Sequence, residues 1–191
     1  MSSTRLLMLG AVRIFQPVHG YFVRRELLTW RADQWAKINP GSIYNALRTL
    51  EREGFISGVE REGKTAYSLT DDGETEFLGL LREALWRVAP NDPTRLYTAI
   101  SFLDALTREE IADALESRLA QLDALHRELP YSLSTLAGPE EKPRHIAEFA
   151  YFGDALVMGE REWTAAFLAR IREGAYAFFG EQALTGRSSQ A

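Results

Sequence analysis

The stretch of residues 41–73 constrains the fold more than any other part of this chain. Ile43, Leu47 and Leu50 recur at spacings of four and three residues, which places them on one face of an α-helix. The opposite face carries hydrogen-bonding or cationic side chains and no acidic one: Ser42, Asn45, Arg48, Thr49 and Arg52. This pattern predicts a helix with one buried face and one face suited to a polar partner.

The sequence also marks where this helix begins and ends. Asn39 is a preferred N-cap residue, and Pro40 is tolerated in the first turn because its missing N–H would have no helical partner there. Gly54 can adopt the left-handed conformation that commonly ends a helix. Residues 4–15 and 21–30 are two further helix candidates before it.

A short β-ribbon is expected after the helix. Residues 55–61 and 65–69 are strand candidates, and the turn between them contains Gly63, which can adopt a positive φ. Thr70 is a suitable N-cap for a next helix over residues 71–88, which has acidic residues in its first turn. A polar-faced helix followed by a basic-tipped ribbon is the layout of a winged helix-turn-helix, a fold that places one helix in a DNA groove.

Composition limits the remaining possibilities. The chain has 191 residues, enough for one large or two modest domains, and 46% of them are hydrophobic. It has no cysteine, which excludes a disulfide framework and thiolate zinc sites. No apolar run reaches the ~20 residues of a membrane span, and the N-terminus lacks a signal-peptide pattern. We therefore expect a cytoplasmic protein with no membrane partner.

The net charge of −5 argues against nucleic acid as a partner until its distribution is considered. Residues 1–70 hold 10 Lys and Arg against 6 Asp and Glu, a balance of +4, whereas residues 71–191 hold 12 against 21, a balance of −9. A basic head on an acidic body is typical of a DNA reader with a separate partner domain. Ordinary scatter of charges explains the same numbers equally well, so the decision rests on the motif.

Prolines and turn-forming residues divide the chain into two regions. The segment Ala-Pro-Asn-Asp-Pro at residues 89–93 is the predicted domain boundary. It separates a winged-helix domain over residues 1–88 from an all-helical domain over residues 94–184, which is followed by a flexible tail at residues 185–191. The expected fold is therefore mainly α with a small β-wing.

The helical region carries more apolar side chains than its own core requires. From a capping box at Thr107, Ile and Leu recur every three or four residues as far as Leu129, a seam that fits packing either in its own domain or against a second helix. Residues 131–143 are expected to form a loop, and a long helix over about residues 145–179 bears a surplus of aromatic side chains. The surplus indicates a second copy of the chain, so residues 94–184 are expected to dimerise.

Several linked motifs resemble those of the PadR family of bacterial transcriptional regulators. They are His19-Gly20-Tyr21, Gly41-Ser42-Ile43-Tyr44, Leu47-x-x-Leu50-Glu51-x-x-Gly54-Phe55-Ile56 and Tyr67-Ser68-Leu69-Thr70-x-x-Gly73. Their order and spacing match over about residues 4–88, and residues 156–163 look like the helical C-terminal domain of the longer PadR-type proteins. The resemblance implies a homodimeric winged-helix repressor of double-stranded DNA, often relieved by a small molecule.

The resemblance also implies which side chains of the helix would meet DNA. They are Gly41, Ser42, Tyr44, Asn45 and Arg48. Ser42 and Tyr44 would contact phosphate or base edges, and Asn45 and Arg48 would read base edges in the major groove. Two alternatives remain: the ring of Tyr44 could pack in the core, and Arg48 could pair with a glutamate of its own helix.

In the wing, Arg61 and Lys64 would reach the DNA backbone or the minor groove. Glu60 and Glu62 flank the same turn, whereas the wings of the family are usually more basic. We therefore expect the wing to contribute less to binding than the helix. The operator would be pseudo-palindromic, because a two-fold dimer presents two identical reading helices.

An effector site is the least constrained part of the prediction. Trp86, Tyr97 and Trp163 would line an aromatic pocket for a small aromatic effector, or they would belong to the ordinary core. Trp86 lies beside the predicted boundary, so an effector bound there would change the spacing of the two reading helices rather than compete for DNA.

No motif for catalysis, cofactor binding or metal binding is evident. The three histidines are far apart, and the sequence has no phosphate loop, nucleophile elbow or dinucleotide turn. We expect neither an enzyme nor a cofactor. The alternative function is a protein-interaction module that uses the winged helix and the acidic body as a scaffold, and an apolar exposed face on residues 41–53 would favour it.

Overall fold

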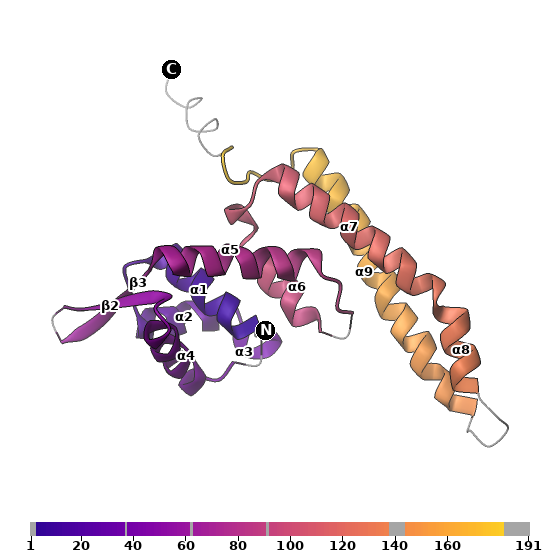
Figure 1. The fold of residues 1–191 in the computed structure, drawn as a ribbon, viewed down its shortest axis with the longest axis horizontal. Coiled ribbons are helices and arrows are strands. Elements are labelled where there is room, and N and C mark those ends of the chain that lie inside the picture. The colour runs from indigo at the N-terminus through magenta and orange to yellow at the C-terminus, as the bar shows by residue number, and fades with distance from the viewer. Residues whose placement is uncertain (1–2, 37, 62, 91, 138–143, 182–191) are drawn as a thin grey trace. The chain divides into compact units, whose positions relative to one another are not determined.

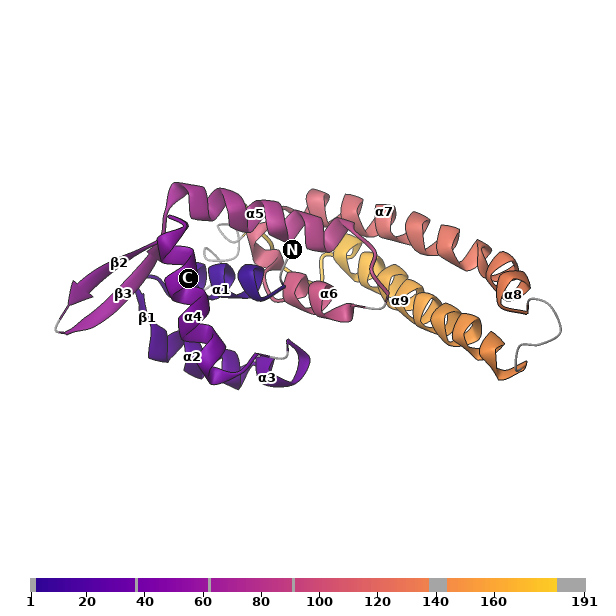
Figure 2. The ribbon, with the colours of Figure 1, turned by 60° about the horizontal axis from the view of Figure 1, so that its bottom comes forward.

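The computed structural model describes residues 3–36, 38–61, 63–90, 92–137 and 144–181. The chain divides into two compact units, an N-terminal unit of residues 1–84 with 94–102 and a C-terminal unit of residues 85–93 with 103–191. Figures 1 and 2 show the elements of each unit from two directions. Helices predominate, and a single small antiparallel sheet accompanies them in the described residues.

The N-terminal unit is a winged helix. Its helices are α1 (Ser3–Phe15), α2 (Gly20–Thr29), α3 (Ala32–Trp35), α4 (Pro40–Arg52), α5 (Asp71–Trp86) and α6 (Pro93–Ile100). The last two residues of α5 and the first residue of α6 are counted with the C-terminal unit. Its strands are β1 (Val18–His19), β2 (Ile56–Arg61) and β3 (Lys64–Leu69), which pair in the order β1-β3-β2. The predicted mainly-α fold with a β-wing is confirmed, and the sheet gains a short strand, β1, that the sequence pattern did not reveal.

Local signals place the ends of these elements. Arg61 pairs with Lys64 across the turn of the ribbon, where Gly63 has φ +72°, the positive value expected for this glycine. The Thr70 hydroxyl accepts a hydrogen bond from the Gly73 N–H at 3.0 Å, so Thr70 caps α5 as predicted. Helix α5 ends at Trp86, two residues before the predicted end.

The core of the N-terminal unit forms between α1, α4, α5 and the segment after α6. Ile43, Leu47 and Leu50 are all buried, which confirms the predicted apolar face of α4. The Phe102 and Phe77 rings meet edge to face with centroids 5.7 Å apart. Residue 10 must be glycine for this packing, because a Cβ there would lie 2.4 Å from Cζ of Phe102.

Helix α6 packs with the N-terminal unit, although it follows the predicted boundary at residues 89–93. The Thr94 hydroxyl donates to the Trp35 carbonyl at 3.3 Å, and the Tyr97 ring lies 6.0 Å from the Trp35 ring. The division into domains at residues 1–88 and 94–184 stays a prediction. The predicted tail, residues 185–191, lies outside the described residues.

The C-terminal unit is helical. Its elements are η1 (Leu103–Ala105), α7 (Arg108–Arg127), α8 (Leu129–Ala137), η2 (Arg144–Ala147) and α9 (Glu148–Arg172), of which η1 and η2 are 3₁₀ turns. Helices α7 and α9 lie side by side along most of their length (Figures 1 and 2). The capping box of α7 is confirmed: the Glu110 N–H donates to Thr107 Oγ1 and the Thr107 N–H donates to Glu110 Oε2.

Two expectations for this unit are wrong. The loop expected from residue 131 is helical as far as residue 137, because Leu129, Leu133 and Leu136 are spaced for one helical face and Pro130 is tolerated in the first turn. Residues 138–143 of that expected loop lie outside the described residues. The last helix ends at Arg172 rather than near residue 179, since Gly174 adopts φ +77° just after it.

Candidate nucleic-acid interface

Two features fix helix α4 in place: the N-cap residue at its start and the buried apolar face along its length. Asn39 has an extended backbone conformation, and its Oδ1 accepts a hydrogen bond from the Ser42 N–H at 2.8 Å. The Ser42 hydroxyl donates back to the Asn39 carbonyl at 2.7 Å. The first of these hydrogen bonds gives a partner to a backbone N–H in the first turn of the helix. The second uses the hydroxyl hydrogen of Ser42, so an external partner could only donate to the Ser42 oxygen. Gly41, beside it, is exposed.

The outward face of α4 presents the predicted readers side by side. Asn45 and Arg48 are both exposed, and the Arg48 guanidinium donates to Asn45 Oδ1. The alternative was that Arg48 pairs with Glu51 or Glu53. Among the described residues Arg48 donates to Asn45 instead, and Glu53 accepts a hydrogen bond from Arg5 at 2.7 Å. A guanidinium has five donors, so most of those of Arg48 remain available for a guanine edge or a phosphate.

Tyr44 combines the two roles considered for it. Its side chain is 40% exposed, whereas its ring packs against Gly20 at the start of α2. A Cβ at position 20 would lie 3.2 Å from Cε1 of Tyr44 and 3.2 Å from Cδ1 of Leu47. The glycine of the His19-Gly20-Tyr21 motif therefore allows α2 to approach α4 closely, and the half-buried ring of Tyr44 keeps its hydroxyl near the surface.

An acidic side chain that the sequence reasoning did not assign to the site lies between α4 and the wing. A Cβ at Gly58 of β2 would lie 2.3 Å from Oε1 of Glu51, so the carboxylate sits directly over this glycine. Burial raises the pKa of Tyr67, the Glu51 carboxylate raises it further, and Arg48 opposes them. Glu51 thus lowers the positive potential at the base of the wing. Its place in the Leu50-Glu51 motif was the only sequence signal for it.

Of the wing residues predicted to contact DNA, Lys64 is the one whose side chain is described. Two aromatic residues near it, Tyr21 and His19, were not predicted. Lys64 Nζ lies 5.8 Å from the centroid of the Tyr21 ring, which stacks with the His19 ring at 6.1 Å. The Thr65 carbonyl lies 3.0 Å from Nδ1 of His19 and accepts its proton in the matching tautomer. The side chain of Arg61, also predicted to contact DNA, lies outside the described part of the chain.

The three aromatic residues predicted to bind an effector are not gathered in one unit. Tyr97 packs against Trp35 in the N-terminal unit. Trp86 and Trp163 belong to the C-terminal unit, where the Trp86 carbonyl accepts a hydrogen bond from Gln121 at 2.9 Å and the Trp163 ring stacks on Phe167 at 5.1 Å. A shared aromatic pocket therefore stays a prediction.

Metal binding and membrane crossing can each be assessed for the described residues. No group of three or more His, Asp or Glu side chains there is arranged to hold a metal ion. Among the helices of the same residues, none has both the length and the apolar character that crossing a membrane requires.

Comparison with known proteins shows what the N-terminal region resembles. The sequence model of the transcriptional regulator PadR-like family matches residues 8–78, from α1 into α5. Bacillus subtilis PadR in complex with operator DNA is 23% identical, with a TM-score of 0.37 and coverage of 87% of this chain and 98% of that one. Its complex with p-coumaric acid is 23% identical with a TM-score of 0.36, covering 89% and 99%. No curated protein matches the sequence.

A PadR-like transcriptional regulator from Bacillus cereus is 18% identical, with a TM-score of 0.36 and coverage of 90% of this chain and 99% of that one. The matching family is one of transcriptional regulators. The motifs that carried the predicted resemblance lie almost wholly inside the matched segment. Residues 8–78 of this chain are therefore similar to the transcriptional regulator PadR-like family.

Proposed function

We propose that this regulator is a homodimeric, DNA-binding repressor in which α4 enters the major groove. The observation that carries the proposal is the outward face of α4, which is polar and cationic with no apolar patch: Ser42, Asn45, Arg48, Thr49 and Arg52. Such a face gains little from contact with an apolar protein surface, whereas it offers donors to base edges and phosphates. Acting on DNA, the protein would work in the cytoplasm.

Arg48 and Asn45 are the proposed base readers. A guanidinium pairs bidentately with guanine O6 and N7, and the hydrogen bond from Arg48 to Asn45 holds both side chains on the same side of the helix. Gly41, Ser42 and Tyr44 at the start of α4 would approach the flanking phosphates. Lys64 and Arg61 in the wing would add backbone contacts, weakened by the acidic Glu60 beside them.

The proposed dimer rests on the exposed aromatic face of α9. Phe149 is 72% exposed and Phe152 is 68% exposed, and with Leu156 they follow the i, i+3, i+7 spacing of one helical stripe. A second copy of the chain would cover this stripe. Two-fold symmetry would then present two α4 helices to half-sites whose centres are about 34 Å apart, and hence to a pseudo-palindromic operator.

The proposed effector is a small aromatic molecule, and its proposed site includes Trp86, Tyr97 and Trp163. Trp86 is the last residue of α5, the helix that follows the wing without a break, so a ligand there could alter how α5 ends. Coupling between the effector and DNA would be reciprocal. Saturating operator DNA should therefore lower the affinity for the effector by the same factor by which the effector lowers the affinity for operator DNA.

Anisotropy titrations of labelled duplexes test the proposal, with selected genomic fragments and random duplex compared at several salt concentrations. Arg48→Ala should cost ~1–3 kcal/mol and relax preference at one base position. Lys64→Ala should weaken all duplexes alike and reduce the salt dependence by about one phosphate contact. Arg127→Ala, at an exposed position in the C-terminal unit, is the matched loss of positive charge and should change neither quantity.

Three outcomes would contradict this proposal or one part of it. If the wild-type protein failed to bind random duplex even at low salt, the protein-interaction module would become the better reading. If Arg48→Ala and Lys64→Ala weakened every sequence equally, Arg48 would contact only the backbone. A footprint confined to one half-site, without a dyad, would contradict the dimeric arrangement alone.

A further inference from the structure

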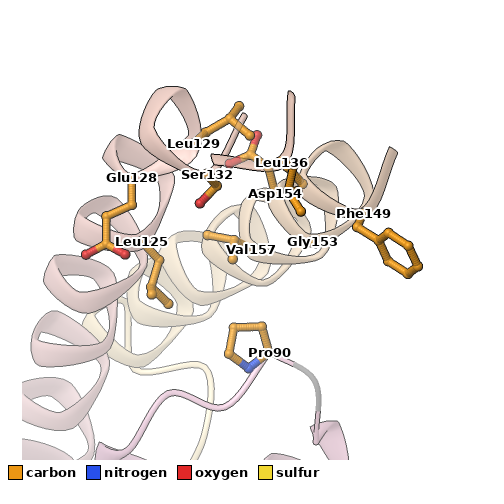
Figure 3. A pocket seen from close by; sticks show the side chains of 11 residues that line it. Pro90, Leu125, Glu128, Leu129, Ser132, Leu136, Phe149, Gly153, Asp154 and Val157 are labelled. Atoms are coloured by element: carbon orange, nitrogen blue, oxygen red, sulfur yellow. The ribbon is translucent and has the colours of Figure 1, made fainter. Parts of the chain in front are cut away.

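The C-terminal unit contains a cleft of about 400 Å³ between the α7–α8 corner and the first half of α9 (Figure 3). Leu129, Leu136 and Val157 supply apolar walls, and Pro90 lies at one edge. Its volume lies within the range of small-molecule sites, which combine apolar walls with a few polar groups. None of the aromatic residues proposed for the effector lines this cleft.

The polar groups of the cleft are acidic or neutral. Glu128 from α7 and Asp154 from α9 contribute carboxylates, and Ser132 from α8 contributes a hydroxyl. No lysine or arginine is among its described lining residues. A site of this kind opposes an anionic ligand and attracts a cation, and the attraction is stronger where apolar walls lower the local dielectric.

The two carboxylates differ in how far they are already neutralised. Asp154 is 17% exposed, and its Oδ1 lies 2.6 Å from Nδ1 of His126, which leaves its second oxygen without this partner. Glu128 is exposed and has no ion pair among the described residues. The cleft therefore keeps at least one negative charge even when His126 is protonated and balances Asp154.

We propose that this cleft binds a hydrophobic organic cation: a molecule with one ammonium group and an apolar body. Its charge lies at the acidic rim formed by Glu128 and Asp154, where the Ser132 hydroxyl oxygen can accept an ammonium hydrogen. Its body lies among Leu129, Leu136 and Val157, where burial of apolar area supplies most of the affinity. Binding of such a ligand is independent of the proposed DNA contacts.

Charge argues against the other candidate occupant, a second copy of the chain. Residues 71–191 carry 12 Lys and Arg against 21 Asp and Glu, so a partner's C-terminal unit would bring a surplus of negative charge to an acidic cleft. The apolar stripe of Phe149, Phe152 and Leu156 on α9 suits a protein partner better, because only Phe149 lines the cleft, whereas Phe152 and Leu156 lie outside it.

Three ligands that differ only in their head group test the proposal: 4-phenylbutylamine, 4-phenylbutan-1-ol and 4-phenylbutyrate. Calorimetric titration of the full-length protein at pH 7 should show the amine binding at least about tenfold more tightly than the alcohol, with the carboxylate weakest. Glu128→Gln and Asp154→Asn should each reduce the affinity for the amine by about three- to tenfold and leave the alcohol unchanged. Glu109→Gln, an exposed acid at the start of α7, should change nothing.

A second kind of variant keeps both carboxylates and instead introduces a fixed ammonium group into the cleft. Leu136→Lys should abolish binding of the amine while the protein keeps its helical circular dichroism. Equal affinity of the three ligands, or an amine preference that survives the combined Glu128→Gln and Asp154→Asn changes, would overturn the proposal. So would failure of the amine to bind together with dissociation of the Leu136→Lys dimer, which would assign the cleft to a second copy. DNA binding measured on the same samples separates these results from failure of the regulator proposal.

Discussion

The two units of this protein differ in how far they bury their apolar side chains. In the N-terminal unit, seven consecutive residues of α1, Leu6–Val12, are buried, and the face of α4 that remains exposed is polar. In the C-terminal unit, α9 is twice as long, yet only five of its residues are buried, and two phenylalanines near its start are mostly exposed. The first unit closes its own core, whereas the second leaves apolar surface open.

The difference indicates what kind of partner each unit can take. A closed core with a polar, cationic face gains free energy from charged and hydrogen-bonding partners, of which duplex DNA is one. An open apolar stripe gains free energy from being covered, by protein or by an apolar ligand. Each of the following predictions tests one side of this contrast, beginning with the largest expected effect.

The largest effect is expected at Arg118, the most deeply buried charge of the C-terminal unit, at 2% exposure. It donates to the Leu85 and Arg87 carbonyls at 2.8 and 3.0 Å and to the carboxylate of Glu160 at 3.0 Å. Arg118→Ala should destabilise this unit by about 3–5 kcal/mol, because a partly buried carboxylate and two carbonyls lose their donor. Urea unfolding followed by circular dichroism measures the loss.

The control for this experiment is Arg172→Ala, which removes the exposed ion pair of Arg172 with Glu116 and should cost less than about 1 kcal/mol. A similar, small cost for both substitutions would show that the C-terminal unit tolerates an unpaired, partly buried carboxylate at Glu160. That result would mean that the contacts of Arg118 do not stabilise a core within the C-terminal unit.

The next effect concerns the stripe on α9. Phe152→Glu should convert the proposed dimer, about twice 21.6 kDa, into a monomer in light scattering, because it would place a charge in the proposed interface and cost about 2 kcal/mol or more. Val59→Glu makes the same change at an exposed apolar position of the wing and should leave the mass unchanged. A wild-type monomer at high micromolar concentration would contradict the contrast between the units.

A smaller effect is expected from the tight packing of the N-terminal core. Gly10→Ala should cost about 1–3 kcal/mol, because the new methyl group would overlap the ring of Phe102, and Phe102→Leu should recover part of the loss. Gly79→Ala is the matched control, since nothing lies within 4 Å of its Cβ position in α5. It should stabilise the protein by roughly 0.5–1 kcal/mol. Thermal unfolding measures both effects. If Gly10→Ala stabilised the protein as Gly79→Ala does, the core around Phe102 would be loosely packed.

The smallest effects are expected at the two helix caps. Asn39→Ala and Thr107→Ala should each cost about 1 kcal/mol of unfolding free energy, because each removes the acceptor for an N–H in the first turn of a helix. Only Asn39→Ala should also weaken DNA binding, since it loosens the start of α4. Equal effects of both caps on DNA affinity would mean that the C-terminal unit contributes directly to the DNA contact.

Much of the fold could be predicted from the sequence because it depends on neighbours within a few residues. The apolar spacing of α4, the caps at Asn39, Thr70 and Thr107, and the positive φ of Gly63 are all local properties of the backbone and its nearest side chains. The polar face opposite the apolar stripe follows from the same helical period. These signals were enough to indicate a winged helix and the residues of its outward face.

The tertiary structure alone decided which distant residues meet. Arg118 lies 42 positions from Glu160, and Glu51 lies over Gly58 only because β2 folds back along α4, so no local pattern marks either contact. The same holds for α6, whose Thr94 reaches the Trp35 carbonyl across 59 positions, and for the acidic cleft between α7, α8 and α9. Periodicity specifies the face that a helix buries, whereas the partner of that face depends on how the whole chain closes its core.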